Sequence, residues 1–351
     1  MKNPFKALRP FLPWCIAAVV CIVFVIVVIG IMKDAEQKGS IIQKQAAMNI
    51  HGSIPQDPLS AQLVSTLAMM PQGKKEIPLV AAVIENHEDA RPLQKGLRKA
   101  EIVFEVIVEG DITRFLVLFR SDRLPAVIEP VRSARLAFIS LLLPYKPLFL
   151  HIGGHPFAYE ALKRYSAVVS HDGIRYDGET YERDPAGEPP HNLMMRRAPL
   201  LQVLEQKNIE SSPLPLFTRT NRMPKGGEPA NRIFVSYGSP IHDVTYIYKS
   251  IYGGLYTRST AGRARQSQPA SVVILETEID GINQPGYVPW TQTFGEGRML
   301  LFRKGKLIRG TWKRDEPYPF QFFDENGDWV SLSKGQVWVA LVETLNRVRW
   351  E

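Results

Sequence analysis

The sequence predicts an α+β protein with an N-terminal transmembrane helix, then an α/β layered domain and a mostly-β C-terminal subdomain. Three observations support this prediction. An uncharged apolar run lies near the N-terminus, runs of strand and helix length alternate over residues 77–204, and short β-rich runs separated by turn signals fill residues 230–351. The 351 residues are 45% hydrophobic and 22% charged, which is a globular composition and excludes a mainly disordered chain.

The apolar run begins at Phe11, ends at Met32 and contains no charged residue. At 1.5 Å per residue its length matches the roughly 30 Å hydrocarbon core of a bilayer, and it lacks the small-residue cleavage pattern of a signal peptide. The basic residues of segment 1–10 precede it. The positive-inside rule therefore predicts a cytoplasmic tail over residues 1–10, a single-pass anchor in the cell membrane over 11–32 and an extracytoplasmic remainder.

Cysteine content and charge exclude several classes of function. Cys15 and Cys21, the two cysteines of the chain, both lie inside the apolar run. The folded part therefore offers no disulfide framework, no thiolate nucleophile and no Cys-ligated metal site. The net charge of +8 is spread without a long basic run, so nucleic acid is not an expected partner. No P-loop, dinucleotide-binding or zinc-protease motif is present, and the sequence predicts no cofactor.

Residues 33–76 are polar and interrupted by Gly and Pro, which is typical of a tether. The α/β domain over 77–204 begins with a buried strand at residues 78–84. Two β-rich runs, 101–109 and 112–119, flank Gly110-Asp111 and predict a hairpin with a two-residue loop. In that register Glu105, Glu109 and Arg114 share one face of the sheet.

The second half of this domain predicts a helix over residues 133–143, a strand over 148–152, and a second helix over 157–165 that follows Gly153-Gly154. A long polar loop, 170–195, comes next, and loops of that length are often functional. Residues 205–229 are the expected linker. The β subdomain over 230–351 has its strongest hairpin signal at Asn326-Gly327.

Five short strings give the sequence a recognisable pattern: VEGDITRF at 108–115, PVRSAR at 130–135, HIGG at 151–154, PHNL at 190–193 and RKGKLIRGTW at 303–312. They resemble the YerB-like family of bacterial envelope proteins (domain of unknown function 3048, N- and C-terminal parts) from about residue 58 onward. The resemblance implies an extracytoplasmic bacterial protein, often a lipoprotein, without a known activity. The chain departs from the family at Glu129, where Gly is usual, and at His155, where Ser is common. A third departure is at residues 261–270, where a Gly-x-Pro-His-x-Asp-like string is missing.

The motifs favour an anion-binding pocket in the α/β domain. Arg132 and Arg135 are three residues apart at a predicted helix start, and Gly153-Gly154 precedes a second helix whose N–H groups attract anions. Guanidinium groups bind carboxylate and phosphate in bidentate fashion. The predicted ligand-binding residues are Asn86, Arg91, Glu105, Glu109, Arg114, Arg132, Ser133, Arg135, His151, Gly153, Gly154, His155, Asp172, His191 and Asn192. The partner would be a cell-wall polymer such as peptidoglycan or an envelope protein.

Three alternatives stay open at this point. His151, His155, His171, Asp172 and His191 are possible metal ligands, although a metal is not the favoured interpretation. Glu105 and Glu109 with His191 could serve an envelope hydrolase, although carboxylates four residues apart on a strand lie about 13 Å apart at ~3.3 Å per residue. No catalytic residue is assigned, and the sequence leans against an enzyme. A structural scaffold could instead use a tyrosine-rich surface around Tyr246, Tyr248, Tyr252 and Tyr256, or a salt-bridge network among the glutamates and arginines.

Overall fold

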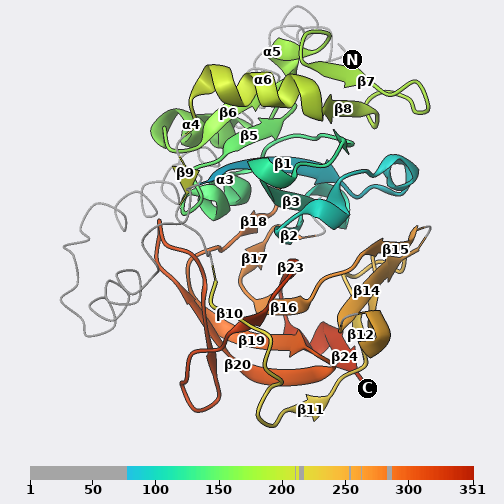
Figure 1. The fold of residues 1–351 in the computed structure, drawn as a ribbon, viewed down its shortest axis with the longest axis vertical. Helices are drawn as coiled ribbons and strands as arrows, with labels where there is room; N and C mark the ends of the chain where they lie inside the picture. The colour runs from blue at the N-terminus through green and yellow to red at the C-terminus, as the bar shows by residue number, and fades with distance from the viewer. Residues whose placement is uncertain (1–76, 210, 213–216, 253, 262, 283–286) are drawn as a thin grey trace, which may run out of the picture. The chain divides into compact units, whose positions relative to one another are not determined.

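The computed structural model describes residues 77–351 except 210, 213–216, 253, 262 and 283–286 (Figure 1). The predicted tail, membrane anchor and tether, residues 1–76, lie outside this part. In the described residues no helix is both long enough and apolar enough to cross a bilayer. The predicted fold class is wrong, because the described chain is mostly β and the structure gives no support to a transmembrane helix.

One large sheet organises the described chain and contains strands from both ends of the sequence (Figure 1). In spatial order it consists of β11 (Glu228–Pro229), β20 (Lys306–Arg314), β19 (Gly295–Arg303), β16 (Ser271–Glu276), β23 (Val337–Val342), β2 (Ile102–Ile107), β3 (Thr113–Arg120), β1 (Ile77–Glu85), β5 (Leu148–His151) and β6 (Val169–Asp172), with β21 (Gln321–Asp324) on β20 and β9 (Ser211–Ser212) on β1. Parallel pairing of β2 with β23 joins the two predicted globular parts.

Smaller sheets and short helices complete the fold. A five-stranded sheet contains, in spatial order, β15 (Arg263–Ser267), β14 (Leu255–Thr260), β13 (Val244–Lys249), β12 (Arg232–Val235) and β24 (Val348–Trp350). A three-stranded sheet contains β4 (Val127–Ile128), β8 (Leu193–Arg196) and β7 (Tyr181–Arg183). Two further pairs of strands are β10 (Arg219–Thr220) with β22 (Leu332–Ser333), and β17 (Ile279–Asp280) with β18 (Trp290–Thr291). The α-helices are α3 (Leu136–Leu142), α4 (Pro156–Arg164), α5 (Gly173–Tyr176) and α6 (Arg197–Lys207). The 3₁₀ turns are η2 (Glu88–Leu93), η3 (Leu97–Lys99), η4 (Glu109–Asp111), η5 (Ser121–Arg123), η6 (Ser250–Tyr252) and η7 (Leu345–Arg347).

The large sheet is buried on both faces, which explains why its central strands read as continuous apolar runs. On one face Ala81 and Phe104 pack with Phe138 of α3 and Ala158 of α4. On the other face, Val80 and Val103 share a core with Leu200 of α6 and with Ile233 of the five-stranded sheet. Tyr246 and Tyr256 belong to this second core and are fully buried, so a surface interaction through these two tyrosines is excluded.

The predicted hairpin forms, but its register differs by one residue from the prediction. Ile107 lies opposite Thr113 and Glu105 lies opposite Phe115, so the loop is longer than Gly110-Asp111. Both loop residues have positive φ inside the turn η4. Because side chains alternate between faces, this shift places Glu105 and Arg114 on opposite faces of the sheet.

Candidate functional site

Strands β1, β2, β5 and β6 run in the same direction, because β5 and β6 are parallel to β1 and the antiparallel β3 lies between β1 and β2. Their carboxyl ends therefore meet at one edge of the sheet, which is where ligands bind in many open α/β sheets. Six of the charged or polar side chains near this edge form what we call the edge cluster: Glu85, Glu109, Arg114, Arg132, Arg135 and His191.

Each carboxylate of the edge cluster contacts more than one cationic or histidine side chain. Glu85 Oε1 lies 3.1 Å from Arg132 Nε, and its Oε2 lies 3.0 Å from His191 Nδ1. Glu109 pairs closely with Arg135, while its second oxygen is 3.9 Å from Arg114 Nη1. The predicted placement of Arg132 and Arg135 on one helix face is wrong, because α3 begins at Leu136 and Arg135 is its N-cap. The two arginines nevertheless reach the same cluster.

The charges of the edge cluster do not cancel. Three guanidinium groups face two carboxylates, and the side chain of Arg114 is only 11% exposed. Burial, together with repulsion from Arg135 and Arg132, lowers the pKa of Arg114 to about 10. Burial opposes ionisation of Glu109, but the hydrogen bond and charge of Arg135 outweigh it and lower the pKa of that carboxyl. The arginines and glutamates of the cluster therefore leave one cation more than anions.

Several N–H groups of these arginines are buried without a hydrogen bond. Among the described residues, Arg114 Nη1 and Arg135 Nε have no hydrogen-bond partner, and Arg132 Nε, although 3.1 Å from Glu85 Oε1, does not have the geometry of a hydrogen bond to it. Arg132 Nη1 does donate to the Pro190 carbonyl at 3.1 Å, and Arg135 Nη1 donates to the Ala134 carbonyl at 2.8 Å. Buried unsatisfied donors are uncommon in native proteins, so the cluster has capacity for a further acceptor.

The residues that follow β5 are held in place by hydrogen bonds within the chain. Gly153 has φ +62°, and a side chain there would lie 3.1 Å from Ile174. Its N–H donates to Asp172 Oδ1 at 2.8 Å, while Asp172 Oδ2 accepts from Tyr159 at 2.6 Å. Both ring nitrogens of His151 are used, by the Gly153 carbonyl and by Ser170. The expected anion at Gly153 is thus provided by Asp172 of the chain itself.

Other predicted ligand-binding residues stabilise the local fold. His155 is the N-cap of α4 and accepts from the Phe157 N–H. Gly154 bridges to Ala134, and Ser133, half-buried, lies near Gly153. Asn192 donates to the carbonyls of Asp184 and Gly187 and so holds the loop before β8. None of these side chains joins the edge cluster through a hydrogen bond or ion pair that the structure records.

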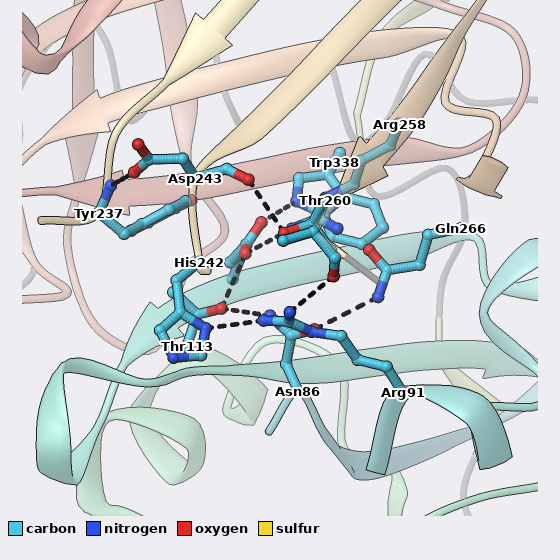
Figure 2. Close-up of polar contacts among 12 residues, drawn as sticks. Asn86, Arg91, Thr113, Tyr237, His242, Asp243, Arg258, Thr260, Gln266 and Trp338 are labelled. Atoms are coloured by element: carbon cyan, nitrogen blue, oxygen red, sulfur yellow. Dashed lines mark hydrogen bonds and ion pairs between the residues drawn. The ribbon is translucent and has the colours of Figure 1, made fainter. Parts of the chain in front are cut away.

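Glu105 belongs instead to a buried network between β2, β14 and β23, whose members Thr113, Arg258 and Trp338 are labelled in Figure 2. Its carboxylate accepts from Arg258 at 2.6 Å, from Thr113 at 2.9 Å and from Trp338 Nε1 at 2.8 Å. The side chains of Glu105 and Arg258 are both fully buried. The Arg258 guanidinium also lies 4.4 Å from the Trp338 ring centroid and 5.0 Å from that of Phe115.

Asn86 and Arg91 extend this network toward the β subdomain. Asn86 donates to Thr113 at 2.7 Å and accepts from Arg91 at 3.3 Å and from Gln266 at 3.3 Å. Arg91 reaches His242 Nδ1 at 2.8 Å. In Figure 2, Asn86 and Arg91 lie at the lower side of the network, and Arg258 and Trp338 lie at its upper side. Asn86 and Arg91 therefore connect the two halves of the described chain, and their burial removes them from contact with a ligand.

The proposed hydrolase residues do not assemble. Glu105 is fully buried in the core network, Glu109 is paired with Arg135, and His191 contacts Glu85. The predicted metal ligands do not gather either: His171 donates to or accepts from Thr180 and lies between the rings of Tyr176 and Tyr181. In the described ranges, the group of three such side chains whose ligand atoms all lie within 4.8 Å of one another is His87, Asp89 and His191.

Sequence reasoning missed the far side of the core network, namely Arg258, Trp338, His242 and Gln266. A signal existed for Glu105, since a carboxylate inside the run IVFEVI must find a partner if the strand is buried on both faces. The sequence did not indicate which of the many later arginines that partner would be. The residues of β14 and β23 approach Glu105 only through the tertiary fold.

Comparison with known proteins identifies relatives that cover most of this chain. The family models for a protein of unknown function (DUF3048) match it with their N-terminal domain at residues 65–210 and their C-terminal domain at residues 233–339. A Bacillus subtilis (strain 168) protein named "Putative lipoprotein YerB" is 32% identical over 279 residues, which cover 76% of this chain and 82% of that protein. The crystal structure of YerB protein from Bacillus subtilis is similar with a TM-score of 0.69 and 30% identity, and covers 79% of this chain and 94% of that one.

Proposed function

Since the chain belongs to the DUF3048 family, whose members include a relative named as a lipoprotein, we propose that it is an extracytoplasmic protein that binds an anionic group of an envelope molecule at the edge cluster. The family name carries no activity, so the argument for binding rests on the geometry of this chain. The location rests on the name of the relative and on the sequence pattern. A cell-wall polymer that carries carboxylates or phosphates, such as peptidoglycan, is the target we favour.

The observation that carries the proposal is Arg114, whose recorded ion pair, with Glu109 Oε2, is long at 3.9 Å. Its guanidinium is held at the carboxyl edge of the sheet beside two other arginines, and its Nη1 has no hydrogen-bond partner among the described residues. A bound carboxylate or phosphate would supply both the acceptor and the missing negative charge. The half-buried His191, 25% exposed, leaves one ring nitrogen for the same ligand while the other contacts Glu85.

The test uses Arg114→Met, because Glu109, which is 3.9 Å from Arg114 Nη1, keeps its closer ion pair with Arg135 when this cation is removed. Arg132 and Arg135 are poorer targets, since removing either would leave Glu85 or Glu109 without its main cation. We would titrate the full chain with inorganic phosphate and with cell-wall muropeptides. The wild type should bind one of the two, and Arg114→Met should lose at least tenfold in affinity while its melting temperature stays the same or rises.

Arg120→Met is the matched control, because Arg120 lies on the same strand and forms a surface pair with Asp122. It should bind as the wild type does. If Arg114→Met also binds as the wild type, or if the wild type binds neither probe, the edge cluster is a structural charge network and the proposal fails.

A further inference from the structure

Two histidines and an aspartate gather at the rim of the edge cluster, although they come from two distant segments of the chain. Ligand atoms of His87, Asp89 and His191 all lie within 4.8 Å of one another. We propose that these three side chains bind one divalent transition-metal ion such as Zn²⁺. Of the metal ligands that the sequence suggested, His191 belongs to this group. The proposal goes beyond the anion site and shares only His191 with it.

His87 and Asp89 are brought together by the turn that begins η2. His87 is the N-cap of this 3₁₀ turn and Asp89 lies in its first turn, so that His87 Nδ1 is 3.4 Å from Asp89 Oδ2. Two ligand atoms of a tetrahedral zinc ion, with bonds of about 2.0–2.1 Å, are about 3.3–3.4 Å apart. The Asp89 N–H also donates to His87 Nδ1, at 3.3 Å, but this hydrogen bond is long and exposed, so water can replace it when a metal binds.

The negative charge of Asp89 is available to a cation. Its side chain is 70% exposed, and within the described ranges it forms no ion pair with a lysine or an arginine. Its contact with His87 compensates the charge only if the imidazole is protonated. A metal ion at this position would supply the positive charge that a neutral imidazole lacks.

His191 has the hydrogen bonding that is typical of a histidine metal ligand. Its Nδ1 lies 3.0 Å from Glu85 Oε2, and because a carboxylate only accepts hydrogen bonds, Nδ1 carries the proton and Nε2 keeps its lone pair. Among the described residues Nε2 has no hydrogen-bond partner. A carboxylate on the second ring nitrogen commonly fixes the tautomer and the orientation of a metal-bound imidazole.

The position of the His191 ring is fixed from two sides. Glu85 is only 4% exposed and lies 3.1 Å from Arg132 Nε, so this carboxylate is itself held in place. The His191 ring also stacks on the ring of His87, with centroids 5.2 Å apart. Small rotations of the exposed Asp89 and of the partly exposed His87 therefore suffice to bring the three ligand atoms to one ion.

The ligand atoms indicate the class of metal. Two imidazole nitrogens and one carboxylate oxygen suit Zn²⁺ and its neighbours among the transition metals, whereas Mg²⁺ and Ca²⁺ prefer oxygen ligands. Three protein ligands leave the fourth position of a tetrahedral ion open. A carboxylate or phosphate could occupy that position, so a metal bound to His191 Nε2 is compatible with the proposed anion site.

The experiment measures metal binding to the metal-free full chain in detergent, in a buffer without phosphate, by competition between the protein and a chromophoric chelator. The wild type should bind one equivalent of Zn²⁺ that Asp89→Asn and His87→Asn each bind at least tenfold more weakly. Mg²⁺ and Ca²⁺ should bind at least tenfold more weakly than Zn²⁺, and Co²⁺ should give the visible absorption bands of a tetrahedral ion. Without metal, both variants should melt as the wild type does, because Asp89 is exposed and Asn is a good N-cap.

His155→Asn is the matched control, because His155 is also an N-cap and accepts the N–H of Phe157 at 3.4 Å. It should bind Zn²⁺ within twofold of the wild type. Arg114→Met should do the same, which separates this test from that of the anion site. Unchanged binding in Asp89→Asn and His87→Asn, or an equal loss in His155→Asn, would overturn the site. Tighter binding of Mg²⁺ or Ca²⁺ than of Zn²⁺ would overturn the assignment of a transition metal.

Discussion

The buried pair of Glu105 and Arg258 allows a prediction whose size can be worked out from its contacts. We consider Arg258→Met, which removes the guanidinium and keeps much of the side-chain volume, and Glu105→Gln, which removes only the negative charge. Although burial opposes a charged guanidinium, Glu105 raises the pKa of Arg258, so this guanidinium stays charged in the folded protein. Removing one member of a buried pair costs about 3–5 kcal/mol of unfolding free energy.

The two single variants should lose different amounts of unfolding free energy within that range. In Arg258→Met, Thr113 and Trp338 still donate to the Glu105 carboxylate, so we expect a loss near 3 kcal/mol. In Glu105→Gln, the guanidinium of Arg258 keeps its ring contacts but has no anion, and its Nε and Nη1 already lack acceptors. We therefore expect a loss nearer 5 kcal/mol.

The double variant shows whether Glu105 and Arg258 stabilise the fold as a pair or independently of each other. Glu105→Gln combined with Arg258→Met leaves no isolated charge in the core, so its loss should be well below the sum of the two single losses. Urea unfolding followed by tryptophan fluorescence and by far-ultraviolet circular dichroism measures all four proteins. Strictly additive losses, or single losses below about 1 kcal/mol, would refute the view that this pair is a mutually dependent buried ion pair.

Two further predictions concern titration and location. Burial lowers the pKa of His171 to about 4, so the folded state takes up this proton less readily than the unfolded state. The free energy of unfolding should be highest above pH 6.5 and should decrease by about 1–2 kcal/mol as the pH falls toward 4. Urea unfolding at a series of pH values should show a smaller decrease for His171→Phe. A reporter enzyme that is active only outside the cytoplasm should be active when fused after Glu351, and an intact but inactive fusion would contradict the extracytoplasmic location.

The strands and their turns could be predicted from the sequence to a useful degree, because their signals are local. The hairpin between β19 and β20 turns at Lys304 and Gly305, both with positive φ, as a two-residue primed turn requires. The β2–β3 hairpin was predicted but misaligned by one residue. The backbone hydrogen bond from the Val108 N–H to the Ile112 carbonyl encloses Glu109, Gly110 and Asp111, so the loop has one residue more than a two-residue primed turn.

The candidate site could be predicted only in part. The arginines at positions 114, 132 and 135 do reach one cluster, but Glu85, which holds Arg132, was not among the predicted residues. Which arginine pairs with Glu85 depends on how the tertiary fold brings the carboxyl ends of separate strands together. The same holds for Glu105, whose partner Arg258 lies 153 residues later in the chain. Periodicity describes which face a residue occupies and contains no information on distant partners.

The parallel pairing of β2 with β23 also sets the order in which the chain can acquire its structure. The Trp338 side chain that bonds to Glu105 is 233 residues away from it in the sequence, so the central sheet stays incomplete until almost the entire chain has been synthesised. Until then β2 is an unpaired edge of an apolar sheet, and such edges promote aggregation of folding intermediates. Contacts of this sequence separation also slow folding. The N-terminal half is therefore expected to depend on the last strands of the protein for solubility as well as for stability.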